Sequence, residues 1–274
     1  NYPAVSLQGT CANQGAKAQL SATLDSKHQT FQLKLEDAEL ADYAGLLTPE
    51  MIDPKQLREI SGHLLQAEIA GERLGDSLFY QGQLELEQGR AVVLDTNQVE
   101  NIRALCSFND KEALLFVNAQ CNGQQAAAHG KITMNQGAPL LDLTVAAQGF
   151  EPSAIFQDIP YKGAVNFTAH VTGLYNEPQV TAEVGIAQGQ VADLSFQNLS
   201  GRLSYQNSMI TVQQLQVDTL GGHVEGTGSF QADSYDFLAS LELQQLSAGE
   251  ISSLSEQLPV LGGRLSGQVT LQGN

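Results

Sequence analysis

The chain has 274 residues, of which 16% are charged, and its 30 acidic and 13 basic side chains give a formal net charge of −17. Because proteins bind DNA and RNA largely through their phosphates, so acidic a chain indicates no nucleic-acid partner. No apolar run reaches the roughly 20 residues that cross a bilayer as a helix. The sequence begins at Asn1 without a signal segment, and we expect a fragment truncated at both ends.

Most of the chain alternates apolar and polar residues with a period of two, which is typical of strands with one apolar and one polar face. Short intervals rich in Gly, Asn and Asp separate these segments, as in the turns of an antiparallel meander. Turns are predicted at Gly82, Gly89, Asn109-Asp110, Gly189, Asn207-Ser208 and Gly221-Gly222. The predicted strands include 83–87, 91–95, 113–119, 131–135, 140–147, 165–172, 180–186, 202–206, 209–212, 214–219, 223–232, 237–243 and 265–271.

Helical patterns occur in three places. Residues 39–60 predict two short helices, and residues 152–158 predict a shorter one. Residues 248–258 carry apolar side chains on a single helical stripe. Ser247 is a predicted N-cap for this last helix, with Glu250 at the capping-box position.

Glycines mark a repeat of about one hundred residues. Gly62, Gly163 and Gly263 lie 101 and 100 positions apart, and an apolar residue follows each of them two places later. Another glycine closes each segment, at Gly71, Gly173 and Gly273. Such a fixed period indicates a repeat architecture.

The segment before each of these glycines repeats as well. Apolar residues stand at offsets 0, 2, 5, 7, 10 and 13 from Leu33 and from Leu241, and the early offsets also match from Val145. We therefore predict one continuous β domain over residues 1–274. Its approximate repeat segments are 1–30 (partial), 31–130, 131–236 and 237–274 (partial).

The apolar residues are mostly aliphatic, since Trp is absent and aromatic residues make up 6% of the chain. Compact sandwiches normally anchor their cores on large aromatic residues. The composition instead favours an all-β, mainly antiparallel, elongated repeating groove with one apolar face and short amphipathic helical inserts. The candidate groove-lining residues are Val165, Phe167, Ala169, Val171, Val180, Val184, Leu241, Leu243, Leu265, Val269 and Leu271.

No motif indicates an active site. The three cysteines, Cys11, Cys106 and Cys121, lack metal-binding spacing and are interpreted as small apolar strand residues. A disulfide between Cys106 and Cys121 stays open, with Asn109-Asp110 as the turn between their strands. The five histidines are scattered and are interpreted as solvated strand positions. We expect no enzyme, cofactor, metal or small-molecule substrate.

Three segments carry a family likeness. They are 263–273 (Gly-Arg-Leu-Ser-Gly-Gln-Val-Thr-Leu-Gln-Gly), 173–180 (Gly-Leu-Tyr-Asn-Glu-Pro-Gln-Val) and 221–230 (Gly-Gly-His-Val-Glu-Gly-Thr-Gly-Ser-Phe). Together with the strand and short helix that precede Gly263, they resemble the repeating β-groove of the TamB/AsmA-like envelope proteins. The likeness is closest to the C-terminal region of the TamB branch, and it covers residues 130–274 better than 30–130.

The resemblance implies a periplasmic location, with an inner-membrane anchor in a segment outside this chain. It implies an apolar groove that holds or conducts lipid acyl chains, with phospholipid as the expected ligand, between the inner and outer membranes. It also implies a role in outer-membrane protein assembly, with a barrel protein of the BamA/TamA type as partner.

Two other interpretations of the β repeats stay open. One is a surface adhesin or structural stalk in which the aliphatic side chains close into a core. The other is a chaperone-like module that adds strands to β-barrel clients through an exposed sheet edge. A continuous apolar surface would distinguish the groove from the closed stalk.

Overall fold

The computed structural model describes residues 4–13, 15–25, 28–42, 57–93, 97–135, 138–154, 160–254 and 262–274. These residues form 17 strands in open, antiparallel sheet structure, with one short α-helix. The all-β antiparallel fold class is therefore confirmed. The chain divides into two compact units, Asn1–Leu143 and Thr144–Asn274.

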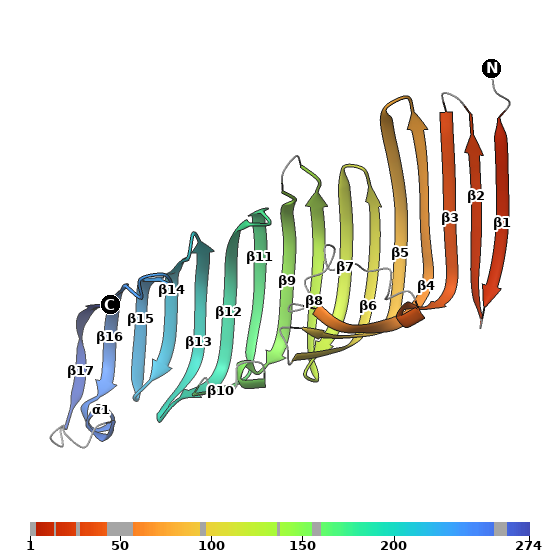
Figure 1. The fold of residues 1–274 in the computed structure, drawn as a ribbon. Coiled ribbons are helices and arrows are strands. Elements are labelled where there is room, and N and C mark those ends of the chain that lie inside the picture. The colour runs from red at the N-terminus through yellow and green to blue at the C-terminus, as the bar shows by residue number, and fades with distance from the viewer. Residues whose placement is uncertain are drawn as a thin grey trace. The chain divides into compact units, whose positions relative to one another are not determined.

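The first unit is a meander in which each strand pairs antiparallel with the next along the chain, from β1 through β8 (Figure 1). Its strands are β1 (Val5–Asn13), β2 (Ala16–Leu24), β3 (His28–Glu39), β4 (Leu57–Leu74), β5 (Ser77–Val93), β6 (Asn97–Asn109), β7 (Glu112–Cys121), β8 (Gln124–Thr133) and the first residues of β9 (Leu140–Phe150).

The second unit continues the same pattern from the later part of β9 onward. Its further strands are β10 (Tyr161–Gly163), β11 (Val165–Leu174), β12 (Glu177–Val191), β13 (Leu194–Gln206), β14 (Met209–Thr219), β15 (Gly222–Gln231), β16 (Phe237–Ser247) and β17 (Arg264–Gly273). β9 pairs with β11, and from β11 to β17 each strand pairs with the next. The short β10 pairs with the far end of β12.

The helical predictions hold only in part. The helix α1 spans Ala248–Ser253, and the Ser247 hydroxyl oxygen accepts a hydrogen bond from the Glu250 N–H at 3.3 Å, which confirms the predicted cap. The predicted helix at 152–158 is a 3-10 turn over Pro152–Ala154, and residues 155–159 and 255–258 lie outside the described residues.

The prediction of helices over 39–60 is wrong at both ends of that segment. β3 extends to Glu39, residues 40–42 form a 3-10 turn, and β4 begins at Leu57. Residues 43–56 lie outside the described part of the chain. Both flanking stretches are strand because they pair with their neighbours, β3 with β4 and β4 with β5.

Several glycines that were predicted as turns lie inside long strands. Gly82 and Gly89 belong to β5, and Gly189 belongs to β12. An added Cβ would lie 2.5 Å from the Phe108 ring at Gly82 and 2.5 Å from the Phe196 ring at Gly189. The missing side chain thus gives room to an aromatic ring on the neighbouring strand, an arrangement that supports glycine within a sheet.

Other predicted turns are confirmed. Residues 110 and 111 connect β6 to β7, and the Asn109 side-chain oxygen accepts hydrogen bonds from the N–H groups of Lys111 and Glu112 at 2.8 and 2.9 Å. Asn207 and Ser208 connect β13 to β14 with φ of 51° and 59°, as the tight turn of a hairpin requires.

A left-handed residue interrupts a strand at the same position of each repeat. Asp37, Gly149 and Gln245 stand at offset 4 from Leu33, Val145 and Leu241, with φ of 54°, 64° and 57°. In β16 the register with β17 shifts at this point, between residues 243 and 246. The left-handed residue at offset 4 is the extra residue of a bulge. Because it adds one residue to the strand, the next apolar side chain on the same face of the sheet stands at offset 5 and not at offset 4.

Side chains from the adjacent repeat strand fix this bend in two copies. The Gly149 N–H donates to the Asn166 side-chain oxygen at 2.8 Å, and the Gln245 N–H donates to the Ser266 hydroxyl at 2.9 Å. Asn166 and Ser266 each stand three residues after the glycine that opens their repeat. Figure 1 shows a similar change of direction in β4 and β5, which have left-handed residues of their own at Glu59 and Gln88.

The buried core of each unit is small. In the first unit Ala38, Leu64 and Leu86 form one cluster with 0%, 4% and 9% exposure. In the second unit Leu246 and Ile186 are among the few buried apolar residues. Among the described residues no large side chain is fully buried. Most apolar side chains of both units are therefore only half-buried.

The left-handed backbone at Gln245, which the equivalent residues of the other repeats share, leads to a testable prediction. Replacement by glycine is expected to change the free energy of unfolding by less than about 0.5 kcal/mol, because glycine adopts φ of 57° without strain. Gln245→Val is expected to cost about 1–2 kcal/mol, since a β-branched residue is strained there. Urea denaturation measures both, with Gln244→Val as control. Equal costs for valine at 244 and 245 would contradict the assignment.

Candidate functional site

The sheet of the second unit has a row of apolar and glycine residues that crosses all seven strands from β11 to β17. Its members are directly opposite one another in the strand register. The row consists of Phe167, Val184, Gly201, Leu215, Gly226, Leu241 and Val269. With about 4.8 Å between strands, seven strands span roughly 29 Å.

Two further rows lie beside this central row on the same face, two residues farther along each strand, allowing for the bulge in β14. The second row is Ala169, Ala182, Leu203, Val212, Gly228, Ala239 and Leu271. The third row is Val171, Val180, Tyr205, Ile210, Phe230, Phe237 and Gly273. We call these three rows the apolar face of the second unit.

The opposite face of the same strands is polar. Thr168, Glu183 and Arg202 stand opposite one another there, and Arg202 donates to the Glu183 carboxylate at 2.6 Å. This ion pair is solvent-exposed and contributes little to stability. The contrast between the two faces means that only one of them can offer apolar contacts to a ligand.

The apolar face is accessible to solvent. Tyr205, Ile210 and Phe237 in the third row are 37%, 37% and 43% exposed. The residues of the central row are half-buried. A face of this size that stays accessible is typical of a surface that binds an apolar ligand or partner.

Eight of the eleven predicted groove-lining residues belong to the three rows. The eight are Phe167, Ala169, Val171, Val180, Val184, Leu241, Val269 and Leu271. Leu243 lies opposite Val224 and Gly267, and Leu265 lies opposite Leu246 at the bend. Val165 begins β11, two residues before the central row.

Sequence reasoning missed the row members on β13, β14 and β15. Gly201, Gly226 and Gly228 were missed because glycine has no apolar side chain to mark a face, although the predicted strand 223–232 contains two of them. An added Cβ at Gly226 would lie 2.6 Å from the Leu241 side chain, so this glycine makes room for the leucine. The period of two would have found two of these residues, because it places Gly226 and Gly228 on the same face of their strand.

The first unit has an apolar face of the same kind. One row consists of Gly9, Leu20, Leu33, Ile69, Gly82, Phe108, Ala113 and Ile132. The next row consists of Cys11, Ala18, Leu35, Ala67, Leu84, Cys106, Leu115 and Gly130. Each unit thus presents its own apolar rows.

All three cysteines are free thiols. Cys106 lies opposite Leu115, six residues from Cys121 along β7, a separation of about 20 Å in an extended strand. A disulfide between Cys106 and Cys121 is therefore excluded. Burial raises the pKa of both thiols, which keeps them protonated and suits their place as small apolar residues.

His223 is the centre of a polar cluster in the second unit. Its Nδ1 lies 2.7 Å from Asp218 Oδ1 and its Nε2 lies 3.3 Å from Glu225 Oε1. The Asn198 side-chain amide donates to Asp218 at 2.8 Å. The hydrogen bond to Asp218 raises the pKa of His223, and the bonds from Asn198 and His223 lower the pKa of Asp218. His223 is thus a paired residue, not a merely solvated one.

This cluster predicts a pH dependence. Because the folded-state pKa of His223 lies above its ordinary 6.5, its contribution to stability is complete below about pH 6.5 and is lost as the pH rises through the folded value. Asp218→Asn is expected to lower the His223 pKa, as measured by NMR titration of the imidazole. Asp193→Asn, on a distant turn, serves as control and should leave it unchanged. An unaltered titration in Asp218→Asn would contradict the pairing.

Within the described residues, no three His, Cys, Asp or Glu side chains come together in a way that could hold a metal ion. The same residues include no helix of the length and apolarity needed to cross a membrane. The comparisons with known proteins add no family. No family model, curated protein or solved structure matches this chain.

Proposed function

We propose that this chain is a periplasmic segment of a TamB/AsmA-like envelope protein whose apolar faces hold or conduct lipid acyl chains. The supporting observation is the set of three apolar rows that crosses seven strands of the second unit, with a polar face behind it. Each methylene of an acyl chain that leaves water on such a face contributes about 0.8 kcal/mol.

The direction of the rows favours movement as well as binding. The rows run across the strands, so an acyl chain lying along them meets an aliphatic or aromatic side chain, or a glycine, at each step of about 4.8 Å. No single deep pocket has to be left for the chain to advance. The proposed roles in transport between membranes and in outer-membrane assembly, with a BamA/TamA-type barrel as partner, rest on the sequence resemblance.

Photo-crosslinking tests the proposal. A benzophenone amino acid at Val171 or Val269, on the apolar face, is expected to capture phospholipid in cells, detected by mass spectrometry of the purified adduct. The matched controls are Thr172 and Thr270, the next residues on the same strands, which face the other way. Equal capture on both faces, or none at either apolar site while the probe remains photoreactive, would overturn the proposal.

A further inference from the structure

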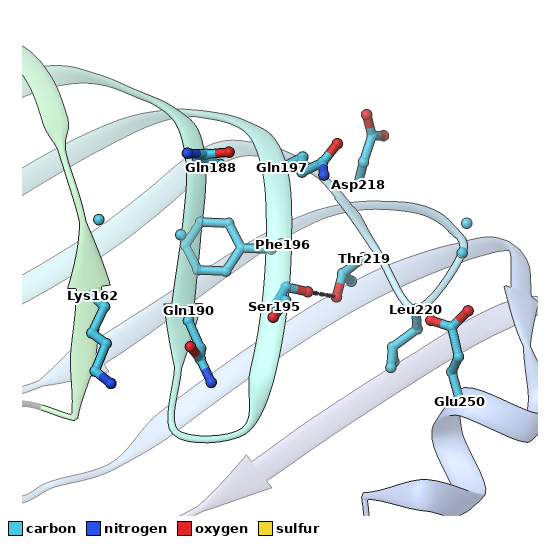
Figure 2. Close-up of a pocket in the computed structure, with 14 residues that line it drawn as sticks. Lys162, Gln188, Gln190, Ser195, Phe196, Gln197, Asp218, Thr219, Leu220 and Glu250 are labelled. Atoms are coloured by element: carbon cyan, nitrogen blue, oxygen red, sulfur yellow. Dashed lines mark hydrogen bonds between the residues drawn. The ribbon is translucent and has the colours of Figure 1, made fainter.

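A pocket of about 790 Å³ lies in the second unit, and none of its lining residues belongs to the three apolar rows (Figure 2). Residues from β10, β12, β13, β14, the turn before β15 and the helix α1 surround it. Its volume falls within the range of about 300–1,000 Å³ that is typical of small-molecule sites. The pocket is therefore large enough for a ligand of several rings.

Three glutamines contribute side-chain amides to the lining. They are Gln188, Gln190 and Gln197, and none of these amides has a hydrogen-bond partner among the described residues. Each primary amide offers two donors and one acceptor. Figure 2 shows these amides between Lys162 on one side and Glu250 on the other. The Gln188 and Gln197 amides lie above the Phe196 ring in this view and the Gln190 amide lies below it, so uncommitted donors and acceptors flank the ring.

The charges of the lining do not select an ion. Lys162 and Glu250 form no ion pair within the described part of the chain, and they carry opposite charges. The remaining charged residue, Asp218, is already bound to His223 and Asn198. An anionic ligand would have only Lys162 as a partner of opposite charge, and a cationic ligand would have only the free carboxylate of Glu250. The lining accordingly suits a ligand without net charge.

An apolar ligand is also unsuitable. It would remove the glutamine amides from water without giving them partners, at a cost of about 1–3 kcal/mol for each group. A hydroxyl group is both a donor and an acceptor, so it can satisfy either end of an amide. We infer that the pocket binds a neutral, hydroxyl-rich ligand, namely a short oligosaccharide, through Gln188, Gln190 and Gln197.

The walls of the pocket are held in place by contacts that do not involve the amides. The Phe196 ring is 7% exposed and packs over Gly189, where no side chain interferes. The Thr219 hydroxyl donates to the Ser195 carbonyl at 2.9 Å and joins β14 to β13, as the dashed line in Figure 2 marks. Binding can therefore use preformed walls, which lowers its entropic cost.

The side-chain amide signals of the glutamines provide the test. Maltotriose, chitotriose and mannotriose are added up to 20 mM to the isotope-labelled chain, and chemical shifts are recorded by NMR. At least one trisaccharide is expected to shift the Gln188, Gln190 and Gln197 amides in a saturable way. Gln188→Ala combined with Gln190→Ala is expected to weaken this binding at least tenfold, while Gln179→Ala with Gln272→Ala, outside the pocket, should not change it.

Two further arms identify the form of the ligand. Vesicles with a trisaccharide glycolipid show whether the same glycan also binds when it is lipid-linked, and binding in either form supports the inference. Phosphoethanolamine, a zwitterion, is the charged competitor. Saturable shifts with phosphoethanolamine alone, or no shift with any saccharide while the spectrum shows a folded protein, would overturn the inference. Neither result depends on the apolar rows, so it leaves the acyl-chain proposal to its own test.

Discussion

Leu64→Ala is expected to lower the free energy of unfolding by about 3 kcal/mol, within the usual range for a leucine truncated in a core. Leu64 is 4% exposed and lies in the bend of the first unit between Ala38 and Leu86, which are its register partners on the two sides. The cost is large because Leu64 is almost fully buried, and its truncation would leave a cavity and remove contacts within this cluster. Urea denaturation followed by circular dichroism measures the change.

The matched control is Leu105→Ala on β6. Leu105 is 50% exposed, so its truncation is expected to cost less than about 0.5 kcal/mol. A similar loss at both positions would mean that the bend is not the core of the first unit. A small loss at Leu64 alone would mean that the neighbouring strands close over the missing side chain.

Leu241→Glu is expected to reduce the affinity for a fluorescent fatty acid at least tenfold. Leu241 stands in the central row, between Gly226 on β15 and Val269 on β17. A carboxylate at this position would have to lose water, or give up its charge, before an acyl chain could lie across it. Titration of the protein with the fluorescent ligand measures the affinity, and circular dichroism on the same sample checks that the strands remain.

Ser240→Glu adds the same charge one residue away, on the polar face of β16, and serves as the control. The affinity of Ser240→Glu for the fatty acid is expected to stay within twofold of that of the unchanged protein. The comparison of the two variants therefore shows whether the effect depends on the face that carries the charge. Leu241→Gln, without a charge, is expected to have an intermediate effect. Unaltered binding in folded Leu241→Glu would show that ligands do not use the central row.

The period of two was enough to predict most strands from residue 83 onward, because each strand has one polar and one apolar face. It gave no strand range for 5–13 or 16–24, which form β1 and β2. The prediction was wrong where two patterns compete. Residues 57–60 were assigned to a helix, yet they belong to β4, whose first two residues, Leu57 and Arg58, pair with Val93 and Val92 of β5. Gly82 was assigned to a turn, yet it lies in mid-strand because the Phe108 ring covers it. Both outcomes depend on a neighbouring strand that local sequence does not reveal.

The candidate site, too, could be predicted from the sequence only in part. Residues such as Val171 and Val269 could be assigned to one face from alternation alone. The continuation of the rows through β13, β14 and β15 required the register, because alternation places Leu215 in a strand without showing that it lies opposite Gly201 and Gly226. The bends were encoded in the step from offset 2 to offset 5, but that step becomes interpretable only with the left-handed φ of Asp37 and Gln245.

The strand-to-next-strand pairing of each unit has a consequence for cooperativity. Where a strand contacts mainly its two neighbours, opening free energies add locally and the chain can unzip strand by strand. Amide hydrogen exchange should therefore be fastest at β17, whose side chains are almost all exposed, and slowest around β4 and β5, which are long strands that meet at the buried Leu64 and Leu86. A ligand bound across several strands would couple their opening, so that these strands would open together and not one at a time.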